Sequence, residues 1–167
     1  EFSAYELAGE ADISIPMVYQ TLKKFLFFGL INKKKNKIKI NFNNLFSFNF
    51  KLLYDSERIF NLPKHMQDKI FSVFDIIKGE YSNDLLGFLI FGSVASNETT
   101  EKSDIDFLAI VKKKKEIDYH KKGLLKIGNI NLIEKEKNEF ENDYLLAEEL
   151  ALNALMNGII LFDSGII

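Results

Sequence analysis

The sequence predicts an α+β protein in which a short helical head with a basic hairpin precedes a body of strands and helices. Two observations predict the body: an apolar run of strand length at 85–91, and a second strand-like segment at 103–111. A third predicts the head, where apolar residues recur at helical spacing before a lysine-rich turn. A chain of 167 residues has room for one ordinary domain or for a small module joined to a larger one.

Composition excludes several classes of site. Apolar residues make up 47% and charged residues 28%, a globular balance, and no apolar run reaches the roughly 20 residues of a membrane span. The chain has no cysteine and only two histidines, so a metal site must use carboxylates, which favour hard cations such as Mg²⁺ or Mn²⁺. We expect a cytoplasmic protein that does not contact a membrane.

Charge is divided unevenly along the chain. Residues 1–43 hold seven lysines against four acidic residues, a charge of +3, so the remaining residues must carry −5 to give the net charge of −2. A basic head on an acidic body predicts that only the head contacts a polyanion.

The pattern of the head predicts a helix, a turn, a second helix and a hairpin. Residues 5–12 fit a short helix, and in the turn that follows Ser14 can cap the next helix while Pro16 lies in its first turn. Apolar residues then repeat at helical spacing until Gly29 ends the helix. Residues 33–37 predict a turn, and the alternation over 38–41 predicts a strand.

This order of elements over Tyr5 to Ile31 resembles the winged helix-turn-helix of archaeal and bacterial regulators, a domain we assign to residues 1–43. The resemblance implies double-stranded DNA as a partner, although a solvated turn or a protein-contact module are alternatives. Side chains of the recognition helix would face the major groove, and lysines of the wing would contact phosphates. These residues are Met17, Gln20, Thr21, Lys23 and Lys24 on the helix, and Lys33, Lys34, Lys35 and Lys37 on the wing.

Two features depart from the winged-helix pattern. The first helix that such a domain packs on its recognition helix is missing before Phe2, so we expect a module that is either truncated here or incomplete. Leu26 and Phe27 occupy positions that are usually charged, and we expect them to pack on another domain or on a second copy of the chain as a homodimer.

Residues 44–62 are predicted to be a helical connector. Residues 45–60 fit a helix capped by Asn43 or Asn44, but the phenylalanines of this segment also alternate as in a strand. We prefer the helix because of the composition of 51–59. After Pro63, residues 64–78 predict a helix that ends at Gly79, so the body is assigned to 63–167.

The body carries a pattern suited to phosphate and metal chemistry. Gly92 and Ser93 follow the first strand, and Asp104 and Asp106 lie two residues apart on the second, so strand alternation places both carboxylates on one face. A divalent cation relieves the repulsion between two such carboxylates. The Gly-Ser turn lets backbone N–H groups approach a phosphate, helped by the start of a helix.

Gly92-Ser93 followed by Asp104-x-Asp106 resembles the signature of the DNA polymerase β nucleotidyltransferase superfamily, and the eleven-residue step from Ser93 to Asp104 resembles its minimal nucleotidyltransferases. The resemblance implies a small mixed β-sheet flanked by helices. It also implies Mg²⁺-dependent transfer of a nucleoside monophosphate from a nucleoside triphosphate to a hydroxyl acceptor. Gly92 and Ser93 would then bind the triphosphate, and Asp104 and Asp106 would be the catalytic, metal-binding residues.

The sequence departs from this family at three kinds of position. Asn97 stands where the next turn usually has a glycine, and asparagine tolerates left-handed backbone better than most residues. Val94 and Ser96 stand where the family often has an arginine, and Asn131 stands where a third carboxylate is normal, on a strand expected at 126–133. Glu134 and Glu136 alternate to the opposite face. Two functions therefore remain open. One is an active nucleotidyltransferase tethered to DNA; the alternative is a DNA-binding regulator, or an antitoxin-like partner of a HEPN-type protein, with an impaired domain.

Overall fold

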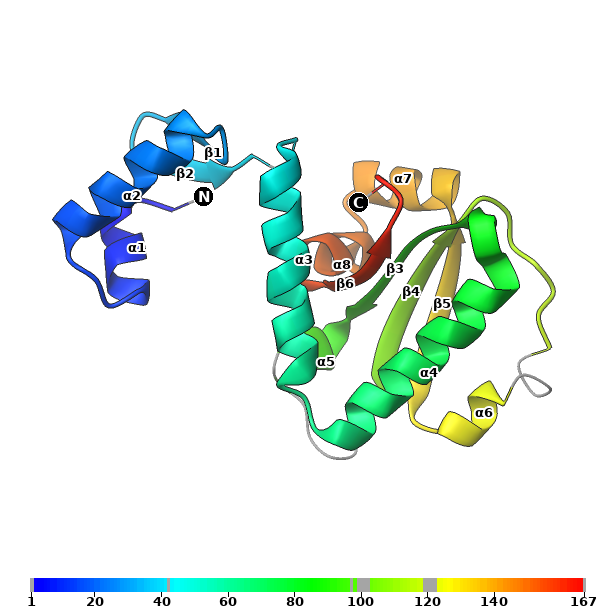
Figure 1. The fold of residues 1–167 in the computed structure, drawn as a ribbon. Helices are drawn as coiled ribbons and strands as arrows, with labels where there is room; N and C mark the ends of the chain where they lie inside the picture. Colours follow the sequence, from blue (N-terminus) through cyan, green and yellow to red (C-terminus); the bar gives the residue numbers. More distant parts are fainter. Residues whose placement is uncertain (1, 42, 97, 99–102, 119–122, 167) are drawn as a thin grey trace. The chain divides into compact units, whose positions relative to one another are not determined.

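The computed structural model describes residues 2–41, 43–96, 98, 103–118 and 123–166, and the chain forms two compact units, Glu1–Tyr54 and Asp55–Ile167 (Figure 1). The division lies inside helix α3 (Leu45–Phe60), whereas the sequence predicts a separate connector over 44–62. The last turns of α3 belong to the second unit because Asp55 and Arg58 bond to its backbone.

Unit 1 contains the elements in the order expected for its head. It comprises α1 (Ala4–Glu10), α2 (Ile15–Phe27), the antiparallel strands β1 (Ile31–Lys34) and β2 (Lys37–Ile40), and the first turns of α3. A capping box of Ser3 and Glu6 begins α1. Ser14 occupies the N-cap of α2 as expected, but its side chain makes no cap hydrogen bond. The core of the unit is small, made of Ala4, Ala8, Val18, Leu22, Ile31 and Ile38.

The hairpin of unit 1 differs in detail from its prediction. The lysines expected in a turn at 33–37 lie mostly in strands, and only Lys35 and Asn36 form the turn. Lys35 has a φ of +56°, in the left-handed region that tight turns require.

The helix predicted over 45–60 is confirmed, and the strand alternative is wrong. Asn44 caps it: the Oδ1 of Asn44 accepts the N–H of Phe46 at 2.9 Å. The Nδ2 of Asn44 donates to the carbonyl of Phe28 at 3.1 Å, and Ser47 donates to the carbonyl of Leu30 at 3.0 Å. These bonds join the start of α3 to the end of α2.

Unit 2 is a four-stranded mixed sheet with helices, as predicted. The strand order is β5-β4-β3-β6, with β4 and β5 parallel and the other pairs antiparallel. After α3 the elements are α4 (Lys64–Tyr81), η1 (Ser82–Asp84), β3 (Leu85–Phe91), α5 (Gly92–Ala95), β4 (Ile105–Val111), α6 (Leu124–Ile127), β5 (Ile130–Glu136), α7 (Lys137–Leu145), α8 (Glu149–Asn157) and β6 (Ile159–Asp163).

Two predicted boundaries in unit 2 are wrong. Helix α4 continues through Gly79 to Tyr81, because Tyr81 is buried in the core and Ser82, with a φ of +49°, is the residue that ends the helix. The strand expected at 126–133 lies at 130–136, because α6 occupies its first residues and ends at Gly128.

Each face of the sheet is covered by helices (Figure 1). On one face, α4 contributes Ile70, Val73 and Ile77 to a core with Phe88 and Phe107. On the other, α7 and α8 contribute Phe140, Ala151 and Ala154 to a core with Leu89 and Leu108. Across the described parts of the chain, none of the helices is long and apolar enough to cross a membrane.

Candidate active site

The candidate site begins where β3 ends at Phe91 and the chain turns into the single turn of α5. Gly92 has a φ of +70°, which side chains other than glycine rarely adopt. A Cβ atom at this position would lie 2.5 Å from Oδ2 of Asp106. The backbone of the turn therefore lies directly against the Asp106 carboxylate, and only glycine permits this approach.

Sheet register brings two of the predicted residues, Asp106 and Asn131, together. Asp106, the second residue of β4, is paired with Phe91 on β3 and with Asn131 on β5. The Nδ2 of Asn131 donates to Oδ1 of Asp106 at 3.1 Å. Asn131 thus stands beside the acid, at the place where the family resemblance expects a third carboxylate.

The other acids of β5 lie on the opposite face, as alternation predicts. Glu134 accepts a hydrogen bond from the hydroxyl of Tyr81 on α4, at 2.9 Å. Burial raises the pKa of Tyr81 to about 12, so its phenol stays protonated and remains a donor to Glu134 at neutral pH. Glu136 precedes α7 and accepts the N–H of Lys114 at 3.0 Å. Neither carboxylate takes the place of Asn131.

Asp104 and Ser93 flank this cluster in sequence. Asp104 is exposed and precedes the first residue of β4 by one position, so the strand is shorter than the predicted segment 103–111. Ser93 is half-buried in α5, and its carbonyl accepts the N–H of Glu98 at 3.0 Å. Because α5 has only four residues, its dipole adds little, and phosphate binding would depend on individual backbone N–H groups.

The two positions where the family often has an arginine have other roles here. Val94 has no exposed surface and belongs to the same buried core cluster as the apolar residues of α4. The hydroxyl of Ser96 donates to the carbonyl of Gly92 at 3.2 Å, so it stabilises the turn itself. Neither side chain supplies a cation to a phosphate. Asn97, at the next turn, lies outside the residues that the structure describes.

The donor set fits a hard divalent cation. Two carboxylates, Asp104 and Asp106, offer oxygen ligands, and magnesium sites commonly use one or two carboxylates with phosphate and water oxygens. Among the residues the structure describes, no cluster of three or more acidic or histidine side chains could hold a metal alone. The Asn131 amide presents its NH₂ group to Asp106 and would have to rotate to offer its oxygen.

Sequence reasoning missed a buried ion pair close behind the turn. Arg58, the only arginine of the chain, contacts Asp55 at 3.2 Å and donates to the carbonyl of Ala95, the last residue of α5. The sequence does indicate this pair, because Asp55 and Arg58 are three residues apart on a predicted helix and such side chains are neighbours on its surface.

The residues predicted to contact DNA all lie in unit 1. Met17, Gln20 and Lys24 are exposed on α2, whereas Thr21 is half-buried. Lys23 is also exposed, as are the hairpin lysines Lys33, Lys34, Lys35 and Lys37. Leu26 and Phe27, the predicted dimer contacts, have exposed fractions of 39% and 84%.

Comparison with known proteins identifies the second unit. The sequence model of a family described as "Nucleotidyltransferase domain" matches residues 73–160, just over half of the chain. A crystal structure of a proposed nucleotidyltransferase from Sulfolobus solfataricus is similar at 18% identity, with a TM-score of 0.38, and the match covers 62% of this chain and 91% of that chain. No curated protein matches. The family match includes the Gly-Ser turn, β4 and Asn131, and the chain belongs to the nucleotidyltransferase domain family.

Proposed function

We propose that unit 2 binds a nucleoside triphosphate with Mg²⁺ or Mn²⁺ between the Gly92-Ser93 turn and the carboxylates of Asp104 and Asp106. Domains of this family use a nucleoside triphosphate and a divalent metal. The observation that carries the proposal is the close approach of Gly92 to Asp106, because it brings the backbone of the Gly-Ser turn against the carboxylate that we propose binds the cation. The reaction would transfer a nucleoside monophosphate to a hydroxyl acceptor.

Each residue of the site has a defined role in this reaction. The N–H groups of Gly92 and Ser93 bind phosphate oxygens, and Asp104 and Asp106 hold the cation. When bound, the cation neutralises charge on the leaving pyrophosphate and favours ionisation of the attacking hydroxyl. Asn131 orients the Asp106 carboxylate through its hydrogen bond but cannot accept a proton at neutral pH.

Titration calorimetry with ATP, with and without Mg²⁺, tests the site. Asp104→Asn combined with Asp106→Asn should abolish the metal-dependent part of binding. Asp75→Asn, on the exposed side of α4, removes one surface carboxylate outside the proposed site and should leave binding unchanged. Metal-dependent binding that survives the double substitution would exclude these carboxylates as the metal site.

The hydrogen bond from Asn131 to Asp106 favours a second candidate function. A site with an amide in place of its third acid can bind nucleotide without turning it over. The chain would then act as a DNA-binding regulator, or as an antitoxin-like partner of a HEPN-type protein, through an impaired domain. Detection of a stable complex with such a partner, and no nucleotidyl transfer to it, would distinguish this function from the first.

Unit 1 would supply the tether to DNA in either case. Its order of elements and its exposed lysines support a winged-helix function, in which α2 enters the major groove and the hairpin contacts phosphates. Replacing Lys33, Lys34, Lys35 and Lys37 by alanine should lower the log–log salt slope of binding by about 0.9 for each phosphate that the hairpin no longer neutralises.

A matched control removes four lysines from unit 2, namely Lys64, Lys69, Lys126 and Lys137. This variant has the same net charge as the hairpin variant and should keep the original slope. An unchanged slope in the hairpin variant would mean that the hairpin does not contact DNA.

A further inference from the structure

We infer that Arg58 and Asp55 are positioning residues for the Gly92-Ser93 turn, an inference that rests on the proposed nucleotide site. Both residues stand on the last turns of α3, inside unit 2. Neither belongs to the Gly-Ser and Asp-x-Asp signature. Their bonds run to the backbone around the turn, so they would act on the site without contacting nucleotide or metal.

The ion pair of Asp55 and Arg58 is buried in unit 2 and bonded to its backbone. The side chain of Asp55 has no exposed surface, and that of Arg58 is 15% exposed. A buried carboxylate is unfavourable unless both of its oxygens are satisfied. Here Oδ1 contacts Nη1 of Arg58 at 3.2 Å, and Oδ2 accepts the N–H of Ile160 on β6 at 2.8 Å. Asp55 therefore connects the guanidinium to the sheet.

The guanidinium of Arg58 donates to three backbone carbonyls. Nη2 donates to Ala95, the last residue of α5, and to Asn157, the last residue of α8, at 3.1 Å in the second case. Nη1 donates to Gly158 at 3.5 Å. Carbonyls at the ends of helices have no partner within the helix, and a cation there is favourable. One side chain thus fixes the ends of two helices relative to each other.

Helix α5 needs such a constraint because it is a single turn of four residues. A helix of this length has too few internal hydrogen bonds to hold its own conformation. Gly92 begins this turn, where it lies against Asp106, and Ala95 ends it, where it bonds to Arg58. The N–H groups that would bind phosphate are therefore held from both ends of the turn.

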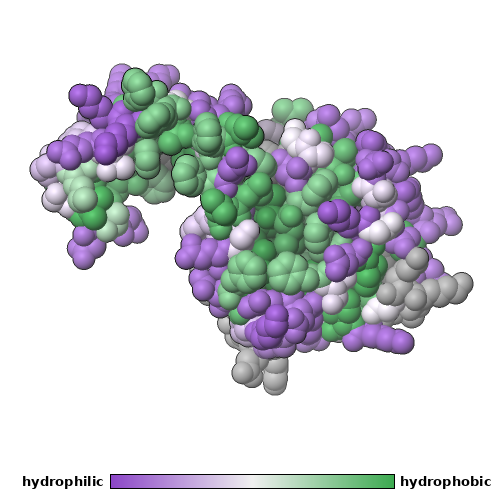
Figure 2. Space-filling view, viewed as in Figure 1, coloured by the Kyte–Doolittle hydropathy of each residue, from purple (hydrophilic) through white to green (hydrophobic). Residues whose placement is uncertain are grey.

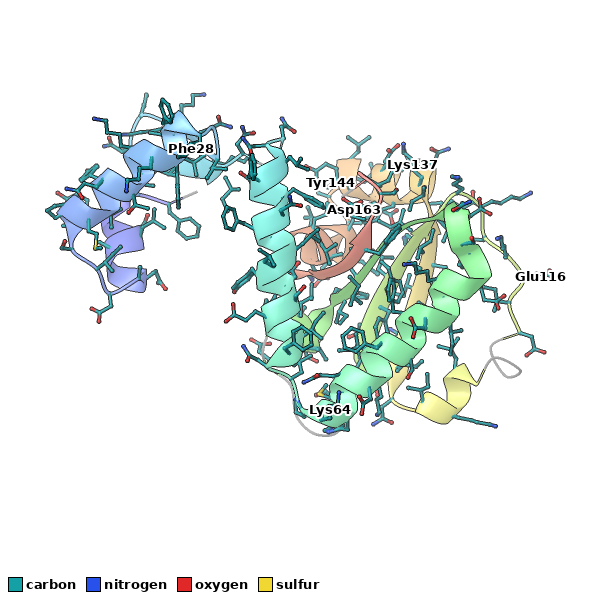
Figure 3. All side chains as sticks on the ribbon, viewed as in Figure 1. Phe28, Lys64, Glu116, Lys137, Tyr144 and Asp163 are labelled. Carbon is teal, nitrogen blue, oxygen red and sulfur yellow. The ribbon has the colours of Figure 1, made fainter. Side chains whose placement is uncertain are left out.

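Arg58→Lys tests the inference because lysine keeps the charge but lacks the planar fork that reaches several carbonyls together. The control is Lys64→Ala, which removes an exposed ion pair with Asp68 at the start of α4 (Figure 3). Two quantities are measured in the full chain: the ¹⁵N–¹H resonances of Gly92 and Ser93 without nucleotide, and the affinity for Mg-ATP.

In Arg58→Lys, the Gly92 and Ser93 resonances should move and Mg-ATP affinity should fall about ten-fold, the effect of removing roughly one hydrogen bond from the turn. The control should change neither. Should Arg58→Lys not fold, Asp55→Asn, which retains the guanidinium but not its charged partner, should show the same changes.

Lower thermal stability with unmoved resonances and unchanged affinity would overturn the inference, because the pair would then be purely structural. Absence of Mg-ATP binding to the unaltered chain would contradict the proposed function instead. The resonances of Gly92 and Ser93 would still decide whether Arg58 positions the turn.

Discussion

The side chains of Ile70, Phe88 and Phe107 in unit 2 have no exposed surface, whereas Phe27, Phe28 and Phe46 in unit 1 expose 84%, 62% and 66% of theirs. Figure 2 shows apolar residues gathered on the surface of unit 1, and Figure 3 labels Phe28 at the end of α2. Unit 1 is too short to enclose all its apolar residues, because small folds bury a smaller fraction of their surface. Unit 2 encloses a core on both faces of its sheet.

This difference separates two kinds of functional surface. In unit 2 the candidate site is set by sheet register and by one close backbone approach, and its residues all lie within the unit. In unit 1 large apolar side chains are exposed, and because exposed apolar patches often mark interaction surfaces, we expect its function to depend on a partner. Substitutions in unit 2 should therefore change ligand binding and catalysis, and substitutions in unit 1 should change association.

The largest effect is expected from Asn131→Asp in unit 2. The substitution places a proton acceptor beside Asp106, and general-base assistance typically contributes about 10² to 10⁴ in rate. Transfer should be slow or undetectable in the unaltered chain and should rise in the variant. Incubation with α-labelled nucleotide and Mg²⁺ or Mn²⁺, alone and with candidate acceptors, measures it.

Asn142→Asp, exposed on α7, is the control for the added charge and should have no effect. Fast transfer by the unaltered chain would show that another group serves as the base. If neither the unaltered chain nor the variant transfers nucleotide to any acceptor, the result would instead favour the regulator function.

Gly92→Ala should weaken nucleotide binding by roughly ten-fold or more, equivalent to about 1.4 kcal/mol. The new Cβ would displace the Asp106 carboxylate, and alanine is strained at a φ of +70°. Gly79→Ala is the matched control, because Gly79 lies inside α4 with open space around it and alanine is the better helix former. Equal Mg-ATP affinity in the two variants would show that the turn tolerates a side chain.

The sequence was sufficient for the features of unit 2 that depend on local pattern. Strand alternation and motif spacing predicted that Asn131 lies on one face of its strand and Glu134 and Glu136 on the other, which the register of β4 and β5 confirms. The helix over 45–60, which begins in unit 1, was also predictable from its composition, and of the two expected caps, Asn43 and Asn44, it is Asn44 that makes the bond.

Features that depend on tertiary contacts could not be predicted. Helix α4 continues past Gly79 because burial of Tyr81 outweighs the low helix propensity of one glycine. Arg58 donates hydrogen bonds to the carbonyls of Ala95 and Asn157, which are 37 and 99 residues away along the chain. The pattern of neighbouring residues in the sequence does not predict contacts over such separations. The early end expected for α4 and the missed ion pair therefore have one cause, which is packing between distant segments.

In unit 1, Phe27→Ser should convert a homodimer into a monomer. We expect a second copy to cover Leu26 and Phe27, and the same unit also has an apolar groove of 340 Å³. The groove is lined by Phe25, Leu30, Ile31, Ile40, Phe50 and Tyr54, among others. Truncation of a central aromatic contact typically weakens association by more than about 1 kcal/mol.

Sedimentation velocity over a range of concentrations measures this association. Leu146→Ser, which removes an apolar side chain of similar exposure from unit 2, should leave the association unchanged. A single monomeric species for the unaltered chain at all concentrations would contradict the dimer, and the apolar surface would then require a different protein partner.

The smallest effect is expected from Tyr81→Phe, which concerns the stability of unit 2 alone. The pKa of Tyr81 is raised to about 12, chiefly by burial, with Glu134 and Glu136 adding to the shift, so folding favours the protonated phenol. The stability linked to this group is fully present below pH 10, the usual pKa of tyrosine, and is lost as pH rises toward 12. Phenylalanine keeps the ring packing and lacks the ionisable hydroxyl.

The Tyr81→Phe variant should lose on the order of 1 kcal/mol at neutral pH, the contribution of one hydrogen bond to Glu134. Denaturant unfolding of both forms at pH 8, 10 and 11 measures the difference, which should shrink or reverse at the highest pH. Parallel loss of stability in both forms above pH 10 would show that Tyr81 does not control the alkaline limit of unit 2.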